Sequence, residues 1–245
     1  MHPTVVRKLL AINHQFYQTF AQEFAATRRR LQPGVLRLLE RLPREARILD
    51  LGCGNGELAR ELARRGFRGR YLGLDFSEEL LRVASNIQHP VPHIEYRTAD
   101  LSAPDWDAGL GPGSFDVALA FAVLHHLPPP LYPQILRKTR ALLTACSRPS
   151  APYSLLLSNW QFLNSPRWRA RLQPWEKVGL TANDVGPDDY LLDWRRGGTG
   201  YRYVHHFNEK ELNKLAADTG FEVVETFYSD GKEGNLACYQ VWRLA

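Results

Sequence analysis

The stretch Ile48-Leu49-Asp50-Leu51-Gly52-Cys53-Gly54-Asn55-Gly56 combines a short apolar run, an acidic residue and three alternating glycines. Glycine has no Cβ, so a loop of this composition permits a sharp turn and close approach of a ligand to the backbone. The helix-forming run 57–65 follows directly. A strand, a glycine loop and a helix in this order predict that a nucleotide-type ligand rests at the helix N-terminus.

The glycine spacing and the acid before it narrow the choice of ligand. A dinucleotide fingerprint needs glycine at its first, third and sixth positions, and the sixth position counted from Gly52 is Glu57. Asp50 closes the strand, where its carboxylate would repel a pyrophosphate and suit a ligand that carries ammonium and sulfonium charges. S-adenosylmethionine is such a ligand. We expect its site to include Asp50, Gly52, Cys53, Gly54, Asn55 and Gly56.

A second acid ends the next apolar run. Residues 71–75 are typical of a buried strand, and the last of them, Asp75, lies about twenty residues beyond the glycine loop. Acids at that offset bind ribose hydroxyls. The alternative role for Asp75 is to cap the helix that is expected to open near Ser77.

With these features, residues 45–160 resemble the class I S-adenosylmethionine-dependent methyltransferases. In that family the acids that end the second and third strands hold the ribose and contact the adenine, and the resemblance gives these roles to Asp75 and Asp100. Residues 114–127 resemble the fourth strand and the loop beside the transferred methyl group. The resemblance also implies cofactor contacts from Tyr17, Phe76, Leu101 and Phe121, with Tyr17 alternatively a core aromatic residue.

Strands alternate with helices along the chain, which predicts an α/β fold with a doubly wound sheet. With the resemblance, this becomes a seven-stranded, mostly parallel, Rossmann-like methyltransferase sheet whose last strands form a hairpin. Strands are expected near 47–51, 70–75, 93–97, 115–121, 153–159, 221–228 and 236–243, and helices near 56–66, 77–87, 131–144 and 208–219. We expect one domain over 1–245, divided into N-terminal helices (1–44), a cofactor-binding core (45–159), a substrate cap (160–206) and a final helix and hairpin (207–245).

Two segments lie outside the alternation. Apolar residues recur at three- and four-residue steps from Val5 to Phe24, which predicts helix over about 4–30 that packs on the domain or closes over the cofactor. A short helix is expected near 35–42. After Trp160 the pattern stops until Phe207, and long irregular segments are usually lids or binding loops. Four of the six tryptophans lie there, either as a small core or in contact with substrate.

Composition limits location and partners. The net charge is +5, and residues 1–75 hold fourteen Lys and Arg against seven Asp and Glu. This excess favours a polyanionic partner, with an arginine-rich solvated surface as the alternative. Cys53, Cys146 and Cys238 are too few and too far apart for a disulfide frame or a zinc site, and we expect no bound metal. No apolar run is long enough to span a membrane, so a cytoplasmic protein without a membrane partner is expected.

Several segments resemble the tRNA wobble-uridine carboxymethyl methyltransferases. They are Phe16–Arg28, the pair His125-His126, Asp189–Trp194 and Arg202–Leu212. Those enzymes esterify the carboxylate of a 5-carboxymethyluridine in the anticodon, so the resemblance implies tRNA as a partner. Eukaryotic members act with a small activating subunit, a partner that the sequence leaves open. The chain departs from the family at Val204, where the family has tyrosine, and at residues 145–150, which replace a proline-glycine-glycine turn.

A carboxylate acceptor needs positioning more than a strong base, because it is already ionised at neutral pH. Arg28 and Arg202 are expected to hold that carboxylate or neighbouring phosphates through forked hydrogen bonds. One of His125, His126 and His205 is expected to donate a further bond. Each has a structural alternative: Arg28 as a cation at a helix C-terminus, and the histidines as packing residues.

Two other functions stay open. A small-molecule methyltransferase would close the insertion over a compact metabolite carboxylate or hydroxyl and leave the arginines on the surface. A non-catalytic binding module would keep the fold without transfer, although the glycines of the loop, Asp75 and Asp100 are all present.

Overall fold

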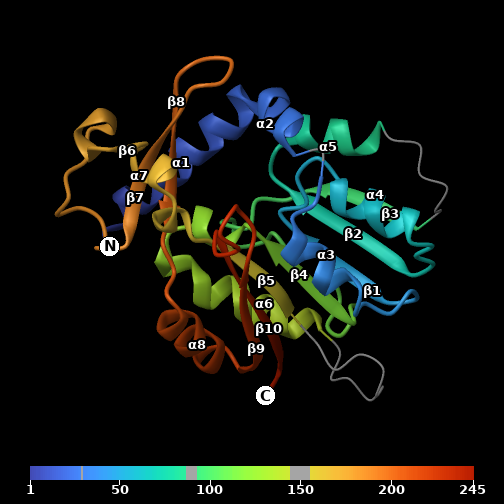
Figure 1. Cartoon of the computed structure of the whole chain (residues 1–245). Coiled ribbons are helices and arrows are strands. Elements are labelled where there is room, and N and C mark those ends of the chain that lie inside the picture. Colours follow the sequence, from blue (N-terminus) through green and yellow to red (C-terminus); the bar gives the residue numbers. More distant parts are fainter. Residues whose placement is uncertain (29, 87–92, 144–154) are drawn as a thin grey trace.

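The centre of the molecule is a seven-stranded sheet with the strand order β3-β2-β1-β4-β5-β10-β9 (Figure 1). This computed structural model describes residues 1–28, 30–86, 93–143 and 155–245. β10 is antiparallel to both of its neighbours, and the described pairs among the first five strands are parallel. The predicted doubly wound, mostly parallel sheet is confirmed. Its strands are β1 (Arg47–Leu51), β2 (Arg70–Asp75), β3 (Ile94–Thr98), β4 (Val117–Phe121), β5 (Leu155–Trp160), β9 (Phe221–Ser229) and β10 (Ala237–Leu244).

The order in which strands are added to the sheet reverses at β1: β2 and β3 lie on one side of it, and β4 and β5 lie on the other. β1 pairs with β2 on one side and with β4 on the other, both in parallel register. In open α/β sheets, ligands bind beyond the carboxyl ends of the strands at such a switch point. Asp50 in β1 and Asp75 at the end of β2 therefore lie where the sequence predicts the cofactor.

Helices cover both faces of the sheet because alternate strand residues point to opposite sides. On one face, Leu49 and Ala118 join a core cluster with α6 and α8. On the other, Ile48 and Leu119 pack with α3 and α4. The core helices are α3 (Pro33–Leu39), α4 (Glu57–Arg64), α5 (Glu78–Ser85), α6 (Tyr132–Leu142) and α8 (Glu209–Asp218), near the ranges predicted for them.

The insertion after β5 is structured rather than irregular. It contains α7 (Pro166–Arg169) and an antiparallel sheet, which we call the cap sheet, of β6 (Leu172–Gln173), β7 (Asp189–Trp194) and β8 (Gly200–His205). The expectation of a long irregular segment was wrong because Asp189, Arg202 and His205 are buried in these strands. Because these buried positions carry polar side chains, the sequence lacks the alternation of apolar and polar residues that predicts a strand.

The N-terminal region forms α1 (Pro3–Thr19) and α2 (Ala21–Thr27), and α1 runs along the cap sheet (Figure 1). Asn13 of α1 is 3% exposed. Its Nδ2 donates to the carbonyl oxygens of His126 (2.8 Å) and Tyr203 (3.0 Å), and its Oδ1 accepts from the Tyr203 amide (2.8 Å). One side chain thus ties α1 to both the loop after β4 and the cap sheet.

Some expectations fall on residues outside the described ranges. Residues 145–150 with Cys146, the ends of the predicted helices at 87 and 144, and the start of the predicted strand at 153–154 are among them. Cys53 and Cys238 are buried free thiols. Among the described helices, none has the length and apolar character needed to cross a bilayer.

Candidate active site

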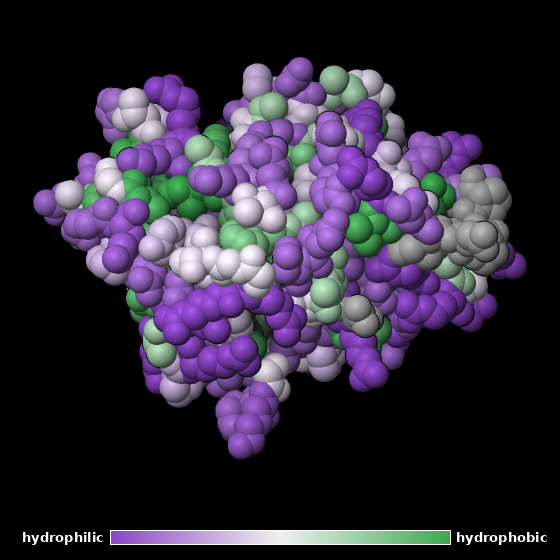
Figure 2. Space-filling model, turned by 90° about the horizontal axis from the view of Figure 1, so that it is seen from above, coloured by the Kyte–Doolittle hydropathy of each residue, from purple (hydrophilic) through white to green (hydrophobic). Residues whose placement is uncertain are grey.

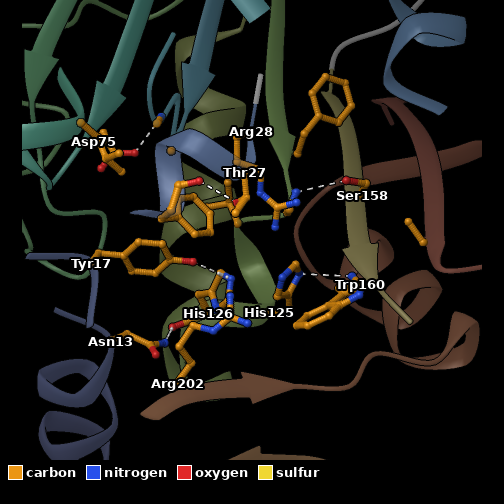
Figure 3. A pocket seen from close by; sticks show the side chains of 18 of the residues that line it. Asn13, Tyr17, Thr27, Arg28, Asp75, His125, His126, Ser158, Trp160 and Arg202 are labelled. Atoms are coloured by element: carbon orange, nitrogen blue, oxygen red, sulfur yellow. Dashed lines mark hydrogen bonds between the residues drawn. The ribbon is translucent and has the colours of Figure 1, made fainter. Parts of the chain in front are cut away.

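A cavity of about 840 Å³ opens at the carboxyl ends of the central strands, bounded by α1, α2 and the cap sheet (Figure 3). This volume lies in the upper part of the ~300–1,000 Å³ range of small-molecule sites. One end holds the glycine loop and two acids, and the other holds arginines and tryptophans of the insertion. The sequence-predicted residues that line it are Tyr17, Arg28, Gly52, Gly54, Asp75, Phe76, Asp100, Leu101, Phe121, His125, His126 and Arg202.

The glycine loop leaves a cradle at one end of the cavity. Gly52 and Gly54 have φ values of +68° and +56°, a region that side chains rarely adopt. A Cβ on Gly52 would lie 2.6 Å from Val123 Cγ2, so the turn has no room for one. A Cβ on Gly54 would meet nothing within 4 Å and would occupy open space beside the cavity. This cradle fits the close approach of a ligand that the sequence predicts.

Asp75 is anchored by backbone amides. Its Oδ2 accepts from Gly54 N and its Oδ1 from Ser77 N, both at 2.9 Å. Burial raises the pKa of Asp75, and these amides oppose the rise. The capping alternative is wrong, because Ser77 caps α5 by accepting from the Leu80 amide. A backbone hydrogen bond from Phe76 also acts on this carboxylate, and about one of its four lone-pair sites remains to accept a hydrogen bond from a ribose hydroxyl.

Asp100 faces the cavity with a partner that the sequence did not suggest. Its Oδ2 lies 3.3 Å from His14 Nε2, and its Oδ1 accepts from the amide and hydroxyl of Ser102. Burial alone would raise the pKa of Asp100, but the bonds from His14 and Ser102 outweigh it and lower that pKa. The His14 ring also stacks on Phe76, with centroids 4.4 Å apart. His14 is 86 residues away from Asp100 in the chain, and no local pattern pairs them.

Four predicted cofactor residues support the loop from outside the cavity lining: Asp50, Cys53, Asn55 and Gly56. Asp50 is 3% exposed and accepts from the Tyr71 hydroxyl, and burial raises the pKa of Asp50 to about 7. The Asn55 amide donates to the Arg28 carbonyl (3.1 Å), while Gly56 is the N-cap residue of α4. The Cys53 thiol lies close to Gly73 of β2, beneath the loop. In this structure the four residues shape the loop, and their cofactor contacts stay predictions.

The two histidines after β4 have different partners. Nδ1 of His126 lies 3.3 Å from the Tyr203 carbonyl and must donate to it, so Nε2 accepts from the Tyr17 hydroxyl at 2.9 Å. Both nitrogens are thus used within the protein. Nδ1 of His125 accepts from the Trp160 amide (3.3 Å), which leaves the ring proton on Nε2. Burial lowers the pKa of both rings, that of His126 to about 3. Both are neutral at pH 7, and His125, which lines the cavity, also has the side chain of Asn159 as a hydrogen-bond partner.

His205 does not line the cavity, contrary to its predicted role at the acceptor. Its Nδ1 lies 2.8 Å from Asp189 Oδ1 and its Nε2 2.9 Å from Glu211 Oε1. Burial would lower the pKa of His205, but the hydrogen bonds to these two carboxylates raise it to about 9. The charged ring joins the cap sheet to α8. In this structure His205 is therefore part of a junction between the cap sheet and α8.

This junction predicts a pH-dependent stability. The pKa of His205 in the folded protein (about 9) exceeds the ~6.5 of an unfolded chain, so its contribution is complete below about pH 6.5 and is lost as the pH rises through 9. His205→Gln should therefore lower the free energy of unfolding by on the order of 2 kcal/mol at pH 6 and much less at pH 10. Urea unfolding across this range measures it, with exposed His93→Gln as the control. Parallel curves for wild type and His205→Gln would contradict the assignment.

Arg202 lies at the floor of the acceptor end and is only 2% exposed. Its guanidinium carbon lies 4.9 Å from the Phe16 ring centroid, 5.5 Å from that of Trp160 and 5.4 Å from that of Trp194. Its Nε has no hydrogen-bond partner, and no carboxylate of the described residues forms an ion pair with it. Burial lowers the pKa of Arg202, which nevertheless stays charged at neutral pH. A buried cation without an anion is costly unless a ligand supplies one.

Further arginines surround the mouth of the cavity. Arg28 is the C-cap residue of α2, the position that its structural alternative requires. Its side chain also lines the cavity, and its guanidinium lies over the Phe24 ring. Asp193 pairs with Arg171 and Arg195. Figure 2, which shows the molecule from above, shows mostly hydrophilic side chains with apolar patches between them. The arginines that line the cavity are Arg28, Arg30, Arg167, Arg171, Arg195, Arg196 and Arg202.

The tryptophans of the insertion divide between core and cavity. Trp175 packs in a cluster with Val5 and Leu9 of α1, away from the cavity. Trp194 is buried against Phe16 but also lines the cavity. Trp160 and Trp168 are half-buried and line the acceptor end. Both expected roles, a small core and contact with the cavity, therefore occur.

Comparison with known proteins identifies the family to which this chain belongs. The chain matches the family described as "Methyltransferase domain" over residues 21–226. "Protein-lysine N-methyltransferase EFM4" of Saccharomyces cerevisiae is 37% identical over 82 residues, 32% of this chain and 34% of that protein. "Ubiquinone biosynthesis O-methyltransferase" of Thiobacillus denitrificans is 28% identical over 180 residues, 73% of this chain and 66% of that protein. The chain thus spans less than two thirds of the length of each of these two relatives.

Solved structures agree on the fold. The Burkholderia thailandensis 1,6-didemethyltoxoflavin-N1-methyltransferase, crystallised with its substrate and S-adenosylhomocysteine, superposes with a TM-score of 0.57 at 19% identity. The alignment covers 98% of this chain and 87% of that one.

Proposed function

The chain belongs to the class I S-adenosylmethionine-dependent methyltransferases, and on that premise we propose that its acceptor is the carboxylate of a 5-carboxymethyl-type uridine at the wobble position of tRNA. The observation that carries this proposal is Arg202, a buried guanidinium that faces the cavity without an acidic partner among the described residues. A carboxylate, like a phosphate, can accept two parallel hydrogen bonds from such a forked donor. An amine acceptor, the chemistry named for the yeast relative, would face repulsion from Arg202 and Arg28.

The residues of the two cavity ends divide the work. Asp75 would hold the ribose of S-adenosylmethionine, Asp100 and Phe76 would flank its adenine, and the Gly52–Gly54 turn would receive its amino acid end. When bound there, S-adenosylmethionine supplies an electrophilic methyl group on a sulfonium sulfur. The acceptor end then has to bind, orient and dehydrate a carboxylate.

No proton has to be removed, because a carboxylate acceptor is ionised at neutral pH. Arg202 would fix its two oxygens, and Nε2–H of neutral His125 would donate a third hydrogen bond. Trp160 and Trp168 would exclude water from this end. The low pKa of the two histidines fits this scheme, since neither acts as a base or as a charged acid.

The tRNA part of the proposal rests on the arginines of the cavity mouth and on the basic N-terminal third of the chain. Contacts between arginine and phosphate release counterions and lose affinity steeply with salt. A second candidate, methylation of a small-molecule carboxylate or hydroxyl, is favoured by the cap that covers the cavity and by the O-methyltransferase relative.

Turnover with methyl-labelled cofactor separates these functions. With tRNA from cells that lack the gene, we expect label in tRNA that mild alkali releases as methanol, because methyl esters hydrolyse and N-methyl or ether groups do not. Raising the salt from 50 to 200 mM should lower kcat/KM for tRNA by at least ~10-fold. Alkali-stable label, or label found only in small metabolites with little dependence on salt, would overturn the tRNA ester proposal.

A further inference from the structure

Trp160 and Trp168 form one wall of the cavity between the buried Arg202 and the arginines of the mouth. Trp160 ends β5, and its labelled side chain lies near Arg202 in Figure 3. Trp168 belongs to α7, and its ring meets that of Trp160 at 81° with centroids 4.7 Å apart. Both residues line the cavity and are half-buried. They therefore present apolar ring surface to whatever fills the acceptor end.

Cations and rings alternate along this wall. The guanidinium carbon of Arg202 lies over the Trp160 ring, 5.5 Å from its centroid. The guanidinium carbons of Arg167 and Arg171 lie over the Trp168 ring, 5.3 and 5.4 Å from its centroid. Arg171 is 3.8 Å from Asp193, whereas no acid of the described chain forms an ion pair with Arg167. The wall thus offers an anion site at its floor, aromatic surface in the middle and a second anion site at the mouth.

A nucleotide with a carboxylate arm has the same order of groups: a carboxylate, a planar base and a phosphate. We propose that Trp168 is the platform on which the base of the acceptor nucleotide stacks, with the carboxylate arm directed to Arg202 and a flanking phosphate to Arg167. This inference rests on the proposed function and names the residues that select its substrate. It requires the nucleotide to leave its own stack, as in other proteins that read single-stranded RNA or act on a base.

The test compares Trp168→Ala with Trp168→Phe on an anticodon stem-loop that carries 5-carboxymethyluridine. Stacking between a base and an aromatic ring depends on the ring, so Trp168→Ala should raise KM about 10- to 100-fold, while Trp168→Phe stays within a few-fold of wild type. The effect on kcat should be small. The Kd for S-adenosylhomocysteine should be unchanged, which reports that the variant is folded.

Tryptophan fluorescence gives a second readout. Adding the stem-loop to the S-adenosylhomocysteine complex should quench emission of wild type, and Trp168→Phe should lose most of that quenching. Trp175→Phe is the matched control, because Trp175 packs against α1 outside the cavity, and it should keep the quenching.

The outcomes distinguish the two proposals. If wild type does not methylate the stem-loop, the proposed function fails, whatever Trp168 does. If wild type methylates it and Trp168→Ala has the KM of wild type, the stacking inference is overturned and the function stands. Equal loss in Trp168→Ala and Trp168→Phe would also overturn stacking, since it would show a need for the indole N–H or for tryptophan's size alone.

Discussion

Arg202→Met should lower kcat/KM for the carboxylate acceptor at least ~100-fold and leave the unfolding temperature unchanged or higher. The lost interaction is a charge-assisted, forked hydrogen bond, worth about 3 kcal/mol. The folded protein meanwhile no longer has to bury a guanidinium that is 2% exposed and lacks an acidic partner in the described chain. Steady-state kinetics and thermal unfolding measure the two effects separately.

The control for Arg202→Met is Arg137→Met, an exposed arginine of α6 that does not line the cavity. Its kinetics should match those of wild type. Arg202→Lys should recover charge but not the fork, and should fall between wild type and Arg202→Met. Activity that is lost only in proportion to lost stability would show that Arg202 serves the packing of Phe16 and Trp194, and would remove the main support for a carboxylate acceptor.

Asp75→Ala should weaken binding of S-adenosylhomocysteine by ~100-fold or more. The variant loses a hydrogen bond between a carboxylate and the ribose, worth about 1.5–3 kcal/mol, and leaves the amides of Gly54 and Ser77 without their acceptor. Calorimetric titration gives the Kd directly.

Asp107→Ala is the matched control for Asp75→Ala, because Asp107 pairs with Lys138 and does not line the cavity. It should bind S-adenosylhomocysteine as wild type does. Asp75→Asn keeps one carbonyl oxygen and should give an intermediate Kd. If Asp75→Ala binds as tightly as Asp107→Ala, the cofactor does not occupy the crevice beyond β1 and β2.

The central sheet could be predicted because its signals are local. β1 and β2 occupy the predicted residues 47–51 and 70–75, since each is a short apolar run that ends near an acid or a glycine. The cap sheet could not be predicted, because its buried hydrogen bonds join residues that are distant in the sequence. Asp189 is buried in β7 only because Tyr203 and His205 of β8 donate to it, and a single strand sequence does not show that pairing.

The candidate site shows the same contrast between residues that local sequence predicts and residues whose role depends on distant contacts. Asp75 and the glycine loop could be placed by spacing, whereas the sequence could not rank the histidines, whose states depend on partners brought by other elements. His126 is occupied by Tyr17 and by the Tyr203 carbonyl, and His205 by Asp189 and Glu211. The contacts of His14 and Trp168 likewise exist only after α1 and α7 fold against the core.

The hydrogen bonds of Asn13 have a consequence for movement of the cap sheet. Because this one side-chain amide bonds both to Tyr203 of the cap sheet and to the His126 carbonyl, independent movement of the cap sheet away from α1 would cost hydrogen bonds. An opening of the cap sheet would either break the two hydrogen bonds between Asn13 and Tyr203, or carry α1 along with the cap and break the one to the His126 carbonyl. Movement of the cap sheet is therefore coupled to a helix that contributes few side chains to the cavity.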